Sequence, residues 1–289
     1  MKSFLQSDNW LEFQKLLNRK IWRIEGVGII KYNLPFKKGY LYASRLRPSD
    51  FGGQARLKGF LDDVRKLAKQ ENAIFLKIEP VEEIDEIKFK NFGFKESHNV
   101  QPIKTIILDI AKSEQELLSE MHYKTRYNIQ LAQKKNIEIK RGKQYFDDFW
   151  GLTEQTVKRD GFRSYPKEYY RKMLEIPGVE LFVAEFNNKI IVANIVVFYE
   201  KTCIYLHGAS DYEHRNLMAP YLLQWEQIKE AKKRGCIEYD FWGINEKKWP
   251  GVTRFKRGFS GREISYPGAY DLIFQPFWYL LYKIARKII

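Results

Sequence analysis

Residues 179–210 read VELFVAEFNNKIIVANIVVFYEKTCIYLHGAS, in which three runs rich in β-branched and aromatic residues follow one another closely. The runs occupy 179–186, 189–199 and 202–210, and only Asn-Asn and Glu-Lys separate them. Side chains of these types favour strands, and two-residue connections favour tight hairpins. The stretch therefore predicts three consecutive antiparallel strands.

Helical patterns lie on both sides of these strands. Two precede them, at 145–160 and 166–175, and one follows from Leu217 to Arg234, where Gly235 supplies a C-terminal stop. The apolar run 236–244 predicts a fourth strand. The second half of the chain therefore has the order helix, helix, three strands, helix, strand.

The first half repeats this order more loosely. A helix near 10–17 precedes three predicted strands, and a helix at 55–69 leads to a fourth strand, 73–80. Aligning YLYAS with YLHGAS sets LAKQENAIFLKIEP beside EAKKRGCIEYDFWG, and KFKNFGFKES beside RFKRGFSGRE. This self-similarity indicates one architecture used twice. The order of elements resembles the GNAT acyltransferase fold, so we expect a mixed α/β (α+β) protein of two tandem GNAT-like domains with mostly antiparallel sheets.

Residues 113–136 predict a helix that links the two halves. Ser113 and Glu116 form a capping box at its start, and its cations share no single face, which is typical of a solvated helix. We expect a first domain of residues 1–144 that includes this helix. The second domain is expected at 145–267, with 268–289 packing back on the first.

Composition narrows the class of protein. Of 289 residues, 50 are Lys or Arg and 36 are Asp or Glu, which gives a net charge of +14. This charge favours polyanionic partners such as nucleic acid or anionic lipid. The alternative is a basic soluble protein without such a partner. Cys203 and Cys236 lie in apolar runs, so neither a disulfide framework nor a metal site is indicated, and a cytoplasmic location fits best. The start of the sequence does not resemble a signal peptide, and the run 190–199 is too short to span a bilayer.

Several familiar motifs are missing. GNAT enzymes that use coenzyme A hold its pyrophosphate on a glycine-rich turn before a helix. The corresponding turn here, DYEHRNLMAP at 211–220, has no glycine, so we expect neither coenzyme A nor any other cofactor. The sequence also lacks the serine-hydrolase elbow, the zinc-protease pair and the P-loop.

The segment 249–270, WPGVTRFKRGFSGREISYPGAY, combines four cations with five aromatic rings and matches no helix or strand period. Together with FLQSDNWLEFQ at 4–14, YKTRYNIQLAQKKNIEI at 123–139 and the stretch 206–244, it resembles the Fem (FemABX) peptidyltransferases over nearly the whole chain. The resemblance implies transfer of an amino acid from aminoacyl-tRNA to the stem peptide of a peptidoglycan precursor. No long helical arm interrupts the second half, so the chain is similar to the compact members.

The resemblance also implies site residues. Phe255 and Lys256 would support the tRNA end and the oxyanion of the tetrahedral intermediate, and Asp109 would orient or deprotonate the acceptor amine. A helix-to-strand joint explains the Phe-Lys pair equally well, since KFKNFGFK in the first half has the same form, and Asp109 also suits a helix cap. The general base can belong to the protein or to the substrate.

The remaining expected site residues would hold the UDP-linked or lipid-linked precursor: Arg163, Tyr169, Tyr205, His207, Trp10, Gln14 and Lys15. Each has a structural alternative, such as a core tyrosine or a surface cation. We expect a monomer, with peripheral contact at the inner face of the membrane as an option. A non-catalytic basic protein that binds RNA or membrane, and an acyltransferase with another acceptor, stay open as alternatives.

The chain end, QPFWYLLYKIARKII, predicts an amphipathic helix that starts just past Pro276. Its apolar residues Trp278, Leu281, Ile284 and Ile288 have helical spacing, and we expect them to pack on the core of the first domain rather than on a membrane.

Overall fold

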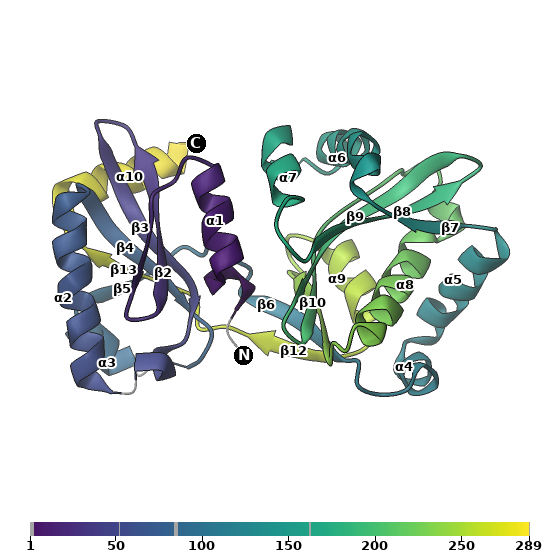
Figure 1. Cartoon of the computed structure of the whole chain (residues 1–289), viewed down its shortest axis with the longest axis horizontal. Coiled ribbons are helices and arrows are strands. Elements are labelled where there is room, and N and C mark those ends of the chain that lie inside the picture. The colour runs from purple at the N-terminus through teal and green to yellow at the C-terminus, as the bar shows by residue number, and fades with distance from the viewer. Residues whose placement is uncertain (1–2, 52, 84–85, 162, 289) are drawn as a thin grey trace. The chain divides into compact units, whose positions relative to one another are not determined.

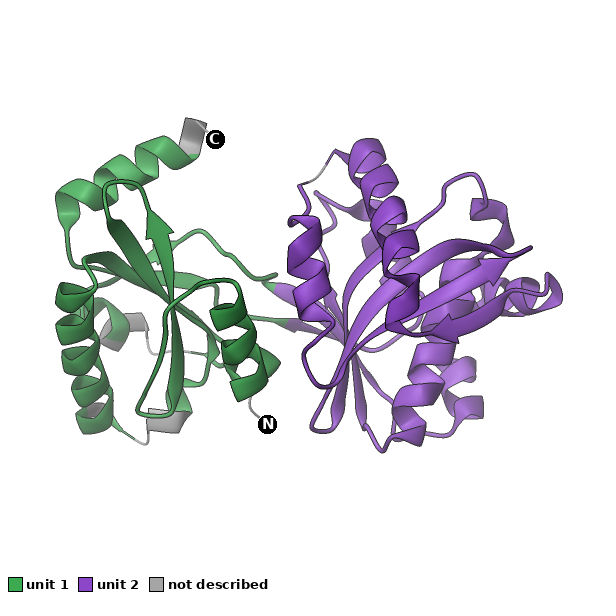
Figure 2. Ribbon diagram, turned by 45° about the horizontal axis from the view of Figure 1, so that its top comes forward, with its two compact units in different colours: residues 1–103, 265–289 green, residues 104–264 purple. Residues whose placement is uncertain are grey.

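The computed structural model describes residues 3–51, 53–83, 86–161 and 163–288, apart from the side chains at 50, 51, 54, 86–88, 287 and 288 (Figure 1). The chain forms two compact units, residues 1–103 with 265–289 and residues 104–264 (Figure 2). Each unit is a sheet covered by helices on both faces.

Unit 1 begins with a short 3-10 turn, Phe4–Gln6, which is capped by the Ser3 hydroxyl as it accepts a hydrogen bond from the Leu5 amide. Its helices are α1 (Asp8–Leu16), α2 (Gln54–Gln70), α3 (Glu86–Asn91) and α10 (Pro276–Ile288). Its strands are β1 (Ile21–Ile24), β2 (Val27–Leu34), β3 (Lys38–Leu46), β4 (Ala73–Pro80), β5 (Phe94–Ser97) and β13 (Ala269–Ile273).

The sheet of unit 1 has the order β1-β2-β3-β4-β13-β5. Because successive strand residues face opposite sides, Leu76 and Ile78 of β4 join the apolar core beneath α2, whereas Phe75 packs on Tyr279 and Tyr282 of α10. In Figure 1, α2 and α10 accordingly lie on different faces of the sheet.

Unit 2 contains the helices α4 (Glu114–Glu120), α5 (Tyr123–Lys134), α6 (Phe146–Asp160), α7 (Lys167–Met173), α8 (Ala219–Lys233) and α9 (Pro250–Arg257). Its strands are β6 (Lys104–Asp109), β7 (Glu138–Arg141), β8 (Val179–Phe186), β9 (Lys189–Tyr199), β10 (Thr202–Ser210), β11 (Glu238–Gly243) and β12 (Arg262–Ser265). The three strands predicted from 179–210 are β8, β9 and β10, with the predicted antiparallel pairing.

The sheet of unit 2 has the order β12-β6-β11-β10-β9-β8-β7. Helices α5 and α8 cover one face, where Ile129 and Leu223 share a buried core with Val196 and Tyr239, and α6 packs on β9 and β10 from the other face. The two sheets follow one plan, since in each of them three antiparallel strands lead through a helix to a parallel fourth strand. Strands from outside the repeat complete each sheet, β13 in unit 1 and both β6 and β7 in unit 2.

The two units differ where their parallel strands run side by side. In unit 1, the pairing of β3 with β4 extends as far as Leu46 and Pro80. In unit 2, the pairing of β10 with β11 ends at Ile204 and Asp240, although both strands continue. Of the two units, only unit 2 therefore has central strands that diverge within the described residues. The site residues predicted in the second half of the chain lie around these strands, β10 and β11.

The predicted domain boundary at residue 144 differs from the structural division at 103 and 264. Strand β6 pairs with β11 of unit 2, and α5 packs on α8, so the linker region belongs to the second unit rather than the first. The predicted linker helix is also two helices, α4 and α5, because Met121 and His122 take extended conformations between them. The capping box of Ser113 and Glu116 is present as predicted.

Two further segments differ from their sequence-based description. Residues 249–270 include a regular helix, α9, which Pro250 begins and Gly258 follows. On α10, Leu281 and Ile284 are exposed, and the residues that face the sheet are Tyr279 and Tyr282. The side chain of Ile288 lies outside the described residues.

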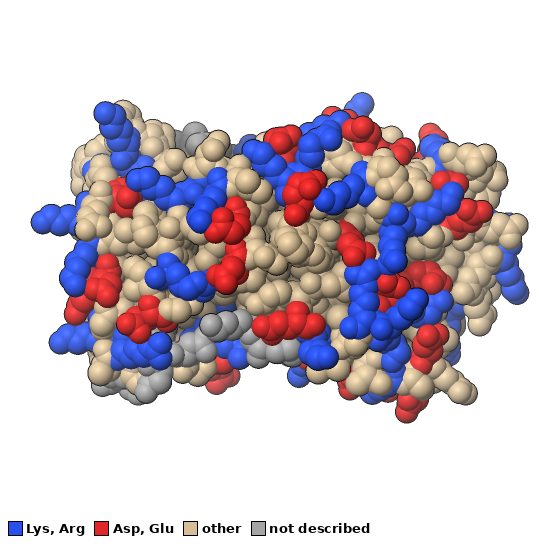
Figure 3. Space-filling model, in the orientation of Figure 1, with Lys and Arg blue, Asp and Glu red and all other residues tan. Residues whose placement is uncertain are grey.

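Charge is not gathered on the face that Figure 3 shows, where Lys and Arg are interspersed with Asp and Glu. Many cations have acidic partners, as Arg234 does with Glu180 and Glu230. Among the described residues, no helix has both the length and the apolar character needed to cross a bilayer.

Candidate functional site

Lys256 lies at the diverging end of the two central strands. Its side chain is buried, and Nζ donates a hydrogen bond of 2.7 Å to the carbonyl oxygen of Gly243, the last residue of β11. Nζ also lies 5.3 Å from the centroid of the Tyr205 ring on β10. The ammonium group therefore contacts both strands where they have separated.

An irregular end of β11 presents the carbonyl oxygen of Gly243 to this lysine. Trp242 has a φ of 58°, a left-handed conformation that is uncommon for a non-glycine residue, and the pairing with β6 shifts between Asp240 and Gly243. The buried carboxylate of Asp240 accepts hydrogen bonds from the Thr105 hydroxyl and, at 2.7 Å, from the Trp242 amide. Asp240 thus holds the backbone that positions Lys256.

Burial lowers the pKa of Lys256 to about 8, against the opposing attraction of Asp240. Because an ammonium group has three donors and Gly243 takes one, two further N–H groups can bind an anion below this pH. The site therefore holds a partly desolvated cation, which stabilises developing negative charge far better than a solvated one does.

The lowered pKa predicts a pH dependence of stability. Between pH 8 and 10.5 the unfolded chain keeps the Lys256 proton that the folded protein has lost, so the unfolded state binds more protons and stability rises with pH. The difference in unfolding free energy between wild type and Lys256→Met should shift in favour of wild type by about 3 kcal/mol between pH 7 and 10.5. Urea denaturation at both pH values measures it, and a pH-independent difference would contradict the burial of the ammonium group.

The repeat offers an internal comparison for the Phe-Lys pair. Lys90 and Phe89 take the matching place in unit 1, and both pairs do lie at a helix-to-strand joint. Lys90 is exposed, however, whereas Lys256 is only 6% exposed and holds the end of a diverging strand. The joint explains the shared sequence pattern but not the burial of Lys256.

Tyr205 and His207 stand on either side of a bulge in β10, where the pairing with β9 shifts by one residue. Burial raises the pKa of Tyr205 to about 12 and lowers that of His207 to about 4, so both are neutral at pH 7. The Tyr205 ring lies over Gly208, where a Cβ atom would come within 1.9 Å of the tyrosine oxygen. Only glycine at 208 leaves room for this ring position.

An aromatic cluster extends from His207 to α7. His207 meets Tyr170 edge-on at 5.1 Å between ring centroids, and Tyr169 stacks on Tyr165 at 4.0 Å. Tyr169 and Tyr170 are buried, and Tyr165 is exposed. Arg163, two residues before Tyr165, is also exposed. The expected residues Arg163, Tyr169 and His207 thus belong to one connected region of unit 2.

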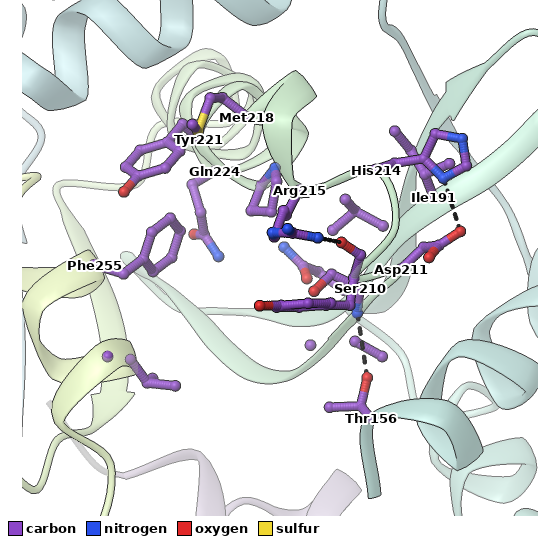
Figure 4. Close-up of a pocket in the computed structure, with 18 of the residues that line it drawn as sticks. Thr156, Ile191, Ser210, Asp211, His214, Arg215, Met218, Tyr221, Gln224 and Phe255 are labelled. Atoms are coloured by element: carbon purple, nitrogen blue, oxygen red, sulfur yellow. Dashed lines mark hydrogen bonds and ion pairs between the residues drawn. The ribbon is translucent and has the colours of Figure 1, made fainter. Parts of the chain in front are cut away.

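A cavity of about 430 Å³ opens beside the diverging strands. Figure 4 shows Phe255, Tyr221 and Gln224 together on one side of it, with Asp211, His214 and Arg215 opposite. Phe255 meets the Tyr221 ring edge-on at 4.8 Å, and Tyr205 also lines the cavity. The volume falls in the range of small-ligand sites.

Two cations flank an exposed ring at this cavity. The guanidinium carbons of Arg215 and Arg159 lie 4.2 Å and 5.5 Å from the centroid of Tyr212. Arg159 also pairs with Asp160, and Arg215 donates to the Tyr212 carbonyl oxygen at 3.1 Å. An arginine pair around an exposed tyrosine is suited to a phosphate-bearing, aromatic ligand.

Several amides of the turn before α8 are already hydrogen bonded within the protein. The amides of Leu217, Met218 and Tyr221 donate to carbonyl oxygens of the same turn, and Pro220 has no N–H group. This backbone is therefore poorly suited to the way in which GNAT enzymes hold coenzyme A.

The structure separates Asp109 from the other expected residues of unit 2. On β6, Asp109 pairs with Glu238 at the start of β11, whereas Thr105 pairs with Gly243 at its end, beside Lys256. Four residues of strand, about 13 Å, therefore lie between Asp109 and the site. Its carboxylate accepts a hydrogen bond from the Ala111 amide in the turn after β6, and the helix that follows is capped by Ser113 instead.

The three expected residues of unit 1 have structural roles there. Trp10 is buried against Phe4 and Phe13, and Lys15 pairs with Glu12 on the surface. Gln14 is buried, and its side-chain oxygen accepts a hydrogen bond from Arg19.

Sequence reasoning missed Asp240, Tyr221, Arg159, Tyr212 and Arg215. The last two lie in the turn at 211–220, where the missing glycine drew attention away from the cations and rings that are present. Among the described residues, no group of three or more His, Cys, Asp or Glu side chains could hold a metal ion.

Two units that each have the GNAT order of elements define a protein of the tandem GNAT fold class. The FemAB family model matches residues 86–187 and 175–287, and the chain belongs to the FemAB family.

Known proteins agree with this assignment. The lipid II:glycine glycyltransferase of Staphylococcus epidermidis is 24% identical, with 98% of this chain and 91% of the relative covered, and that of Staphylococcus aureus is 23% identical with the same coverage. A crystal structure of FemX has a TM-score of 0.84 at 21% identity and covers 96% of this chain and 94% of its own. A tandem GNAT protein from the clavulanic acid biosynthesis pathway has a TM-score of 0.56 at 10% identity, covering 91% and 93%. The structural likeness confirms the predicted fold class.

Proposed function

We propose that this protein transfers an amino acid from aminoacyl-tRNA to the stem-peptide amine of a lipid-linked peptidoglycan precursor. Relatives that match nearly the whole chain carry the name lipid II:glycine glycyltransferase, which supports the acceptor class and makes glycine the first amino acid to test. The observation that carries the proposal is the buried ammonium group of Lys256 at the diverging strands.

The reaction joins an amine to an ester carbonyl. The amine nitrogen attacks the carbonyl carbon, and the carbonyl oxygen becomes an oxyanion. Collapse of the intermediate breaks the bond to the ribose oxygen of the tRNA end, which leaves as a hydroxyl with the proton that the amine nitrogen loses. Lys256 is a group of this chain that can stabilise the oxyanion, because its ammonium is desolvated and keeps two donors beyond the one that Gly243 accepts. No covalent intermediate on the protein is needed.

The cavity supports the donor side of the proposal. An aminoacyl-adenosine end requires a ring platform and cations for the adjoining phosphates. Phe255 and Tyr221 provide the rings, and Arg159 and Arg215 flank Tyr212 at the same cavity. The residue before α5, His122, donates its amide hydrogen bond to the carbonyl oxygen of Gly258 just after α9, and Tyr123 and Tyr127 of α5 are both 62% exposed.

The aromatic cluster at α7 supports the acceptor side. A muropeptide precursor carries a pyrophosphate, which an arginine binds well, and sugars and peptide that pack on aromatic rings. Arg163 and Tyr165 are exposed next to the buried Tyr169 and Tyr170 and the half-buried His207. We therefore assign this region to the precursor.

Incubation with charged tRNA tests the proposed function. The protein is mixed with tRNA carrying one labelled amino acid at a time, and with either the UDP-linked or the lipid-linked muropeptide, and the muropeptide mass is measured. We expect one added amino acid residue on the lipid-linked acceptor, with glycyl-tRNA as the preferred donor. An unchanged muropeptide with every donor would contradict the proposal.

The acceptor assignment predicts a binding defect for Arg163→Ala. Phosphate contacts persist in ground and transition states alike, so we expect KM for the precursor to rise about tenfold with little change in kcat. Arg171→Ala is the matched control, because Arg171 is exposed on α7 and pairs with Asp147 and Glu168. If Arg163→Ala changed only kcat, or only the response to tRNA concentration, the assignment of Arg163 would be wrong.

A further inference from the structure

Helix α10 carries an apolar stripe on the side that faces away from its sheet. Phe277, Leu280, Leu281 and Ile284 are 68%, 57%, 41% and 50% exposed. Their spacing of three, one and three residues places them on one face of the helix. A surface helix of a soluble protein normally has polar residues there, so this contiguous stripe indicates an interaction surface.

The opposite face of α10 is fixed to unit 1. Tyr279 and Tyr282 pack on Phe75 with ring centroids 5.2 Å and 5.1 Å apart, and the Tyr279 hydroxyl donates to Asp271 at 2.8 Å. Asp271 in turn forms a fully buried ion pair with Lys77. The stripe is therefore displayed by an anchored helix rather than by a loose chain end.

The turn between β2 and β3 extends the same surface. Phe36, at its tip, is 79% exposed and lies 5.7 Å from the Trp278 ring of α10. Between this turn and α10 runs a cleft of about 480 Å³ that Leu34, Phe36, Trp278 and Leu281 help to line. We call Phe36, Phe277, Leu280, Leu281 and Ile284 the α10 surface.

The charged residues that neighbour the α10 surface along the sequence are all positive, whereas one acidic residue of another element, Glu96 of β5, lines a pocket together with Lys283 and Arg286. Lys37 and Lys38 follow Phe36, Lys283 and Arg286 lie on α10, and neither 33–39 nor 272–288 contains an acidic residue. Lys38 Nζ lies 4.9 Å from the centroid of the Trp278 ring, and Lys283 Nζ lies 5.9 Å from that of Tyr279. Aromatic and aliphatic side chains bordered by Lys and Arg match the interface of a bilayer with anionic headgroups.

We propose that the α10 surface docks this protein on an anionic lipid bilayer, with α10 lying in the plane of the headgroups. Basic residues near an anionic surface strengthen the attraction to it, and burial of the apolar stripe adds to this attraction. A symmetric dimer through the same surface would instead bring these like charges together, which is unfavourable. Docking goes beyond the proposed transfer reaction and is measurable without any substrate.

Vesicle flotation tests the docking. Full-length protein is mixed with vesicles of 30% phosphatidylglycerol in phosphatidylcholine, or of phosphatidylcholine alone. We expect binding to the anionic vesicles that falls with salt, and at least tenfold weaker binding for Leu280→Gln/Ile284→Gln. Val100→Gln/Ile237→Gln is the matched control, because it changes two apolar residues of similar exposure outside the α10 surface. For charge, Lys283→Gln should weaken binding and the exposed Lys66→Gln should not.

Three outcomes would overturn the docking. They are no flotation with anionic vesicles, equal flotation of Leu280→Gln/Ile284→Gln and its control, and a protein dimer in solution that Leu280→Gln/Ile284→Gln abolishes. Thermal unfolding checks that the variants are folded. Transfer to the lipid-linked muropeptide dispersed in a neutral detergent, without vesicles, should be the same in wild type and Leu280→Gln/Ile284→Gln, so loss of docking is distinguishable from failure of the proposed reaction.

Discussion

Lys256→Met should slow amino acid transfer by a factor on the order of 100 or more, the scale seen when one oxyanion donor is removed. Methionine fills a similar volume without the charge, so the buried position on α9 is kept. The Michaelis constants for tRNA and precursor should change little, because the ammonium acts mainly on the charge that develops in the transition state. Single-turnover rates at pH 7 measure the effect.

Lys248→Met is the matched control for this experiment. Lys248 lies just before α9 in the same segment, but it is exposed. Its replacement should leave the rate unchanged. A Lys256→Met protein that is folded and turns over at a near-normal rate would show that another group stabilises the oxyanion.

Lys77→Met should lower the free energy of unfolding by about 3–5 kcal/mol, the cost of leaving a buried charge without its partner. Lys77 Nζ lies 2.8 Å from the Asp271 carboxylate, and neither side chain is exposed. The lysine also donates to the His98 carbonyl oxygen at 3.0 Å and to the Ser97 hydroxyl. Because Asp271 holds Tyr279, the variant should also loosen α10. Urea unfolding followed by circular dichroism measures the loss.

A second substitution separates the buried charge from simple loss of packing. Lys77→Met/Asp271→Leu removes both charges and should regain most of the stability, since a buried ion pair is often replaceable by apolar side chains. Lys66→Met, at an exposed ion pair with Asp63, should cost less than about 1 kcal/mol. No rescue by the double substitution would mean that the two side chains act independently.

The repeated fold was predictable because its signals are local. The hairpin turns lie directly between the strands that they join, at 187–188 and 200–201. The glycine that ends the helix, at 235, lies within a few residues of it. The structure confirms each of these elements. The division of the chain was not predictable in the same way. Strand β6 belongs to unit 2 through its pairing with β11, more than 120 residues later, which no local pattern shows.

The candidate site was predictable only in part for the same reason. Lys256 and Phe255 sit in a segment of unusual composition, but the burial of Lys256 depends on the point at which β10 and β11 separate. Asp109 and Asp240 both look like strand aspartates in sequence. Their roles follow from the register of β6 against β11, which puts Asp240 near Lys256 and Asp109 at the far end.

The orientation of α10 could not be predicted from the spacing of its apolar residues. Helical spacing correctly predicts an amphipathic helix, but it cannot say which face meets the protein. Tyr279 and Tyr282 face the sheet because their rings pack against Phe75, one edge-on and one tilted, while the purely aliphatic residues Leu280 and Ile284 lie outside. The aromatic partner across the sheet decides the orientation.

The fate of the amino acid in a single turnover tests the central claim most directly. Excess protein is mixed with glycyl-tRNA carrying a radiolabelled glycine and with the lipid-linked muropeptide, and the label is followed with time. The proposed mechanism predicts that the label moves from tRNA to the muropeptide with wild type and at least 100-fold more slowly with Lys256→Met. Label that stays on the tRNA, or that appears only as free glycine at the same rate in both proteins, would contradict it.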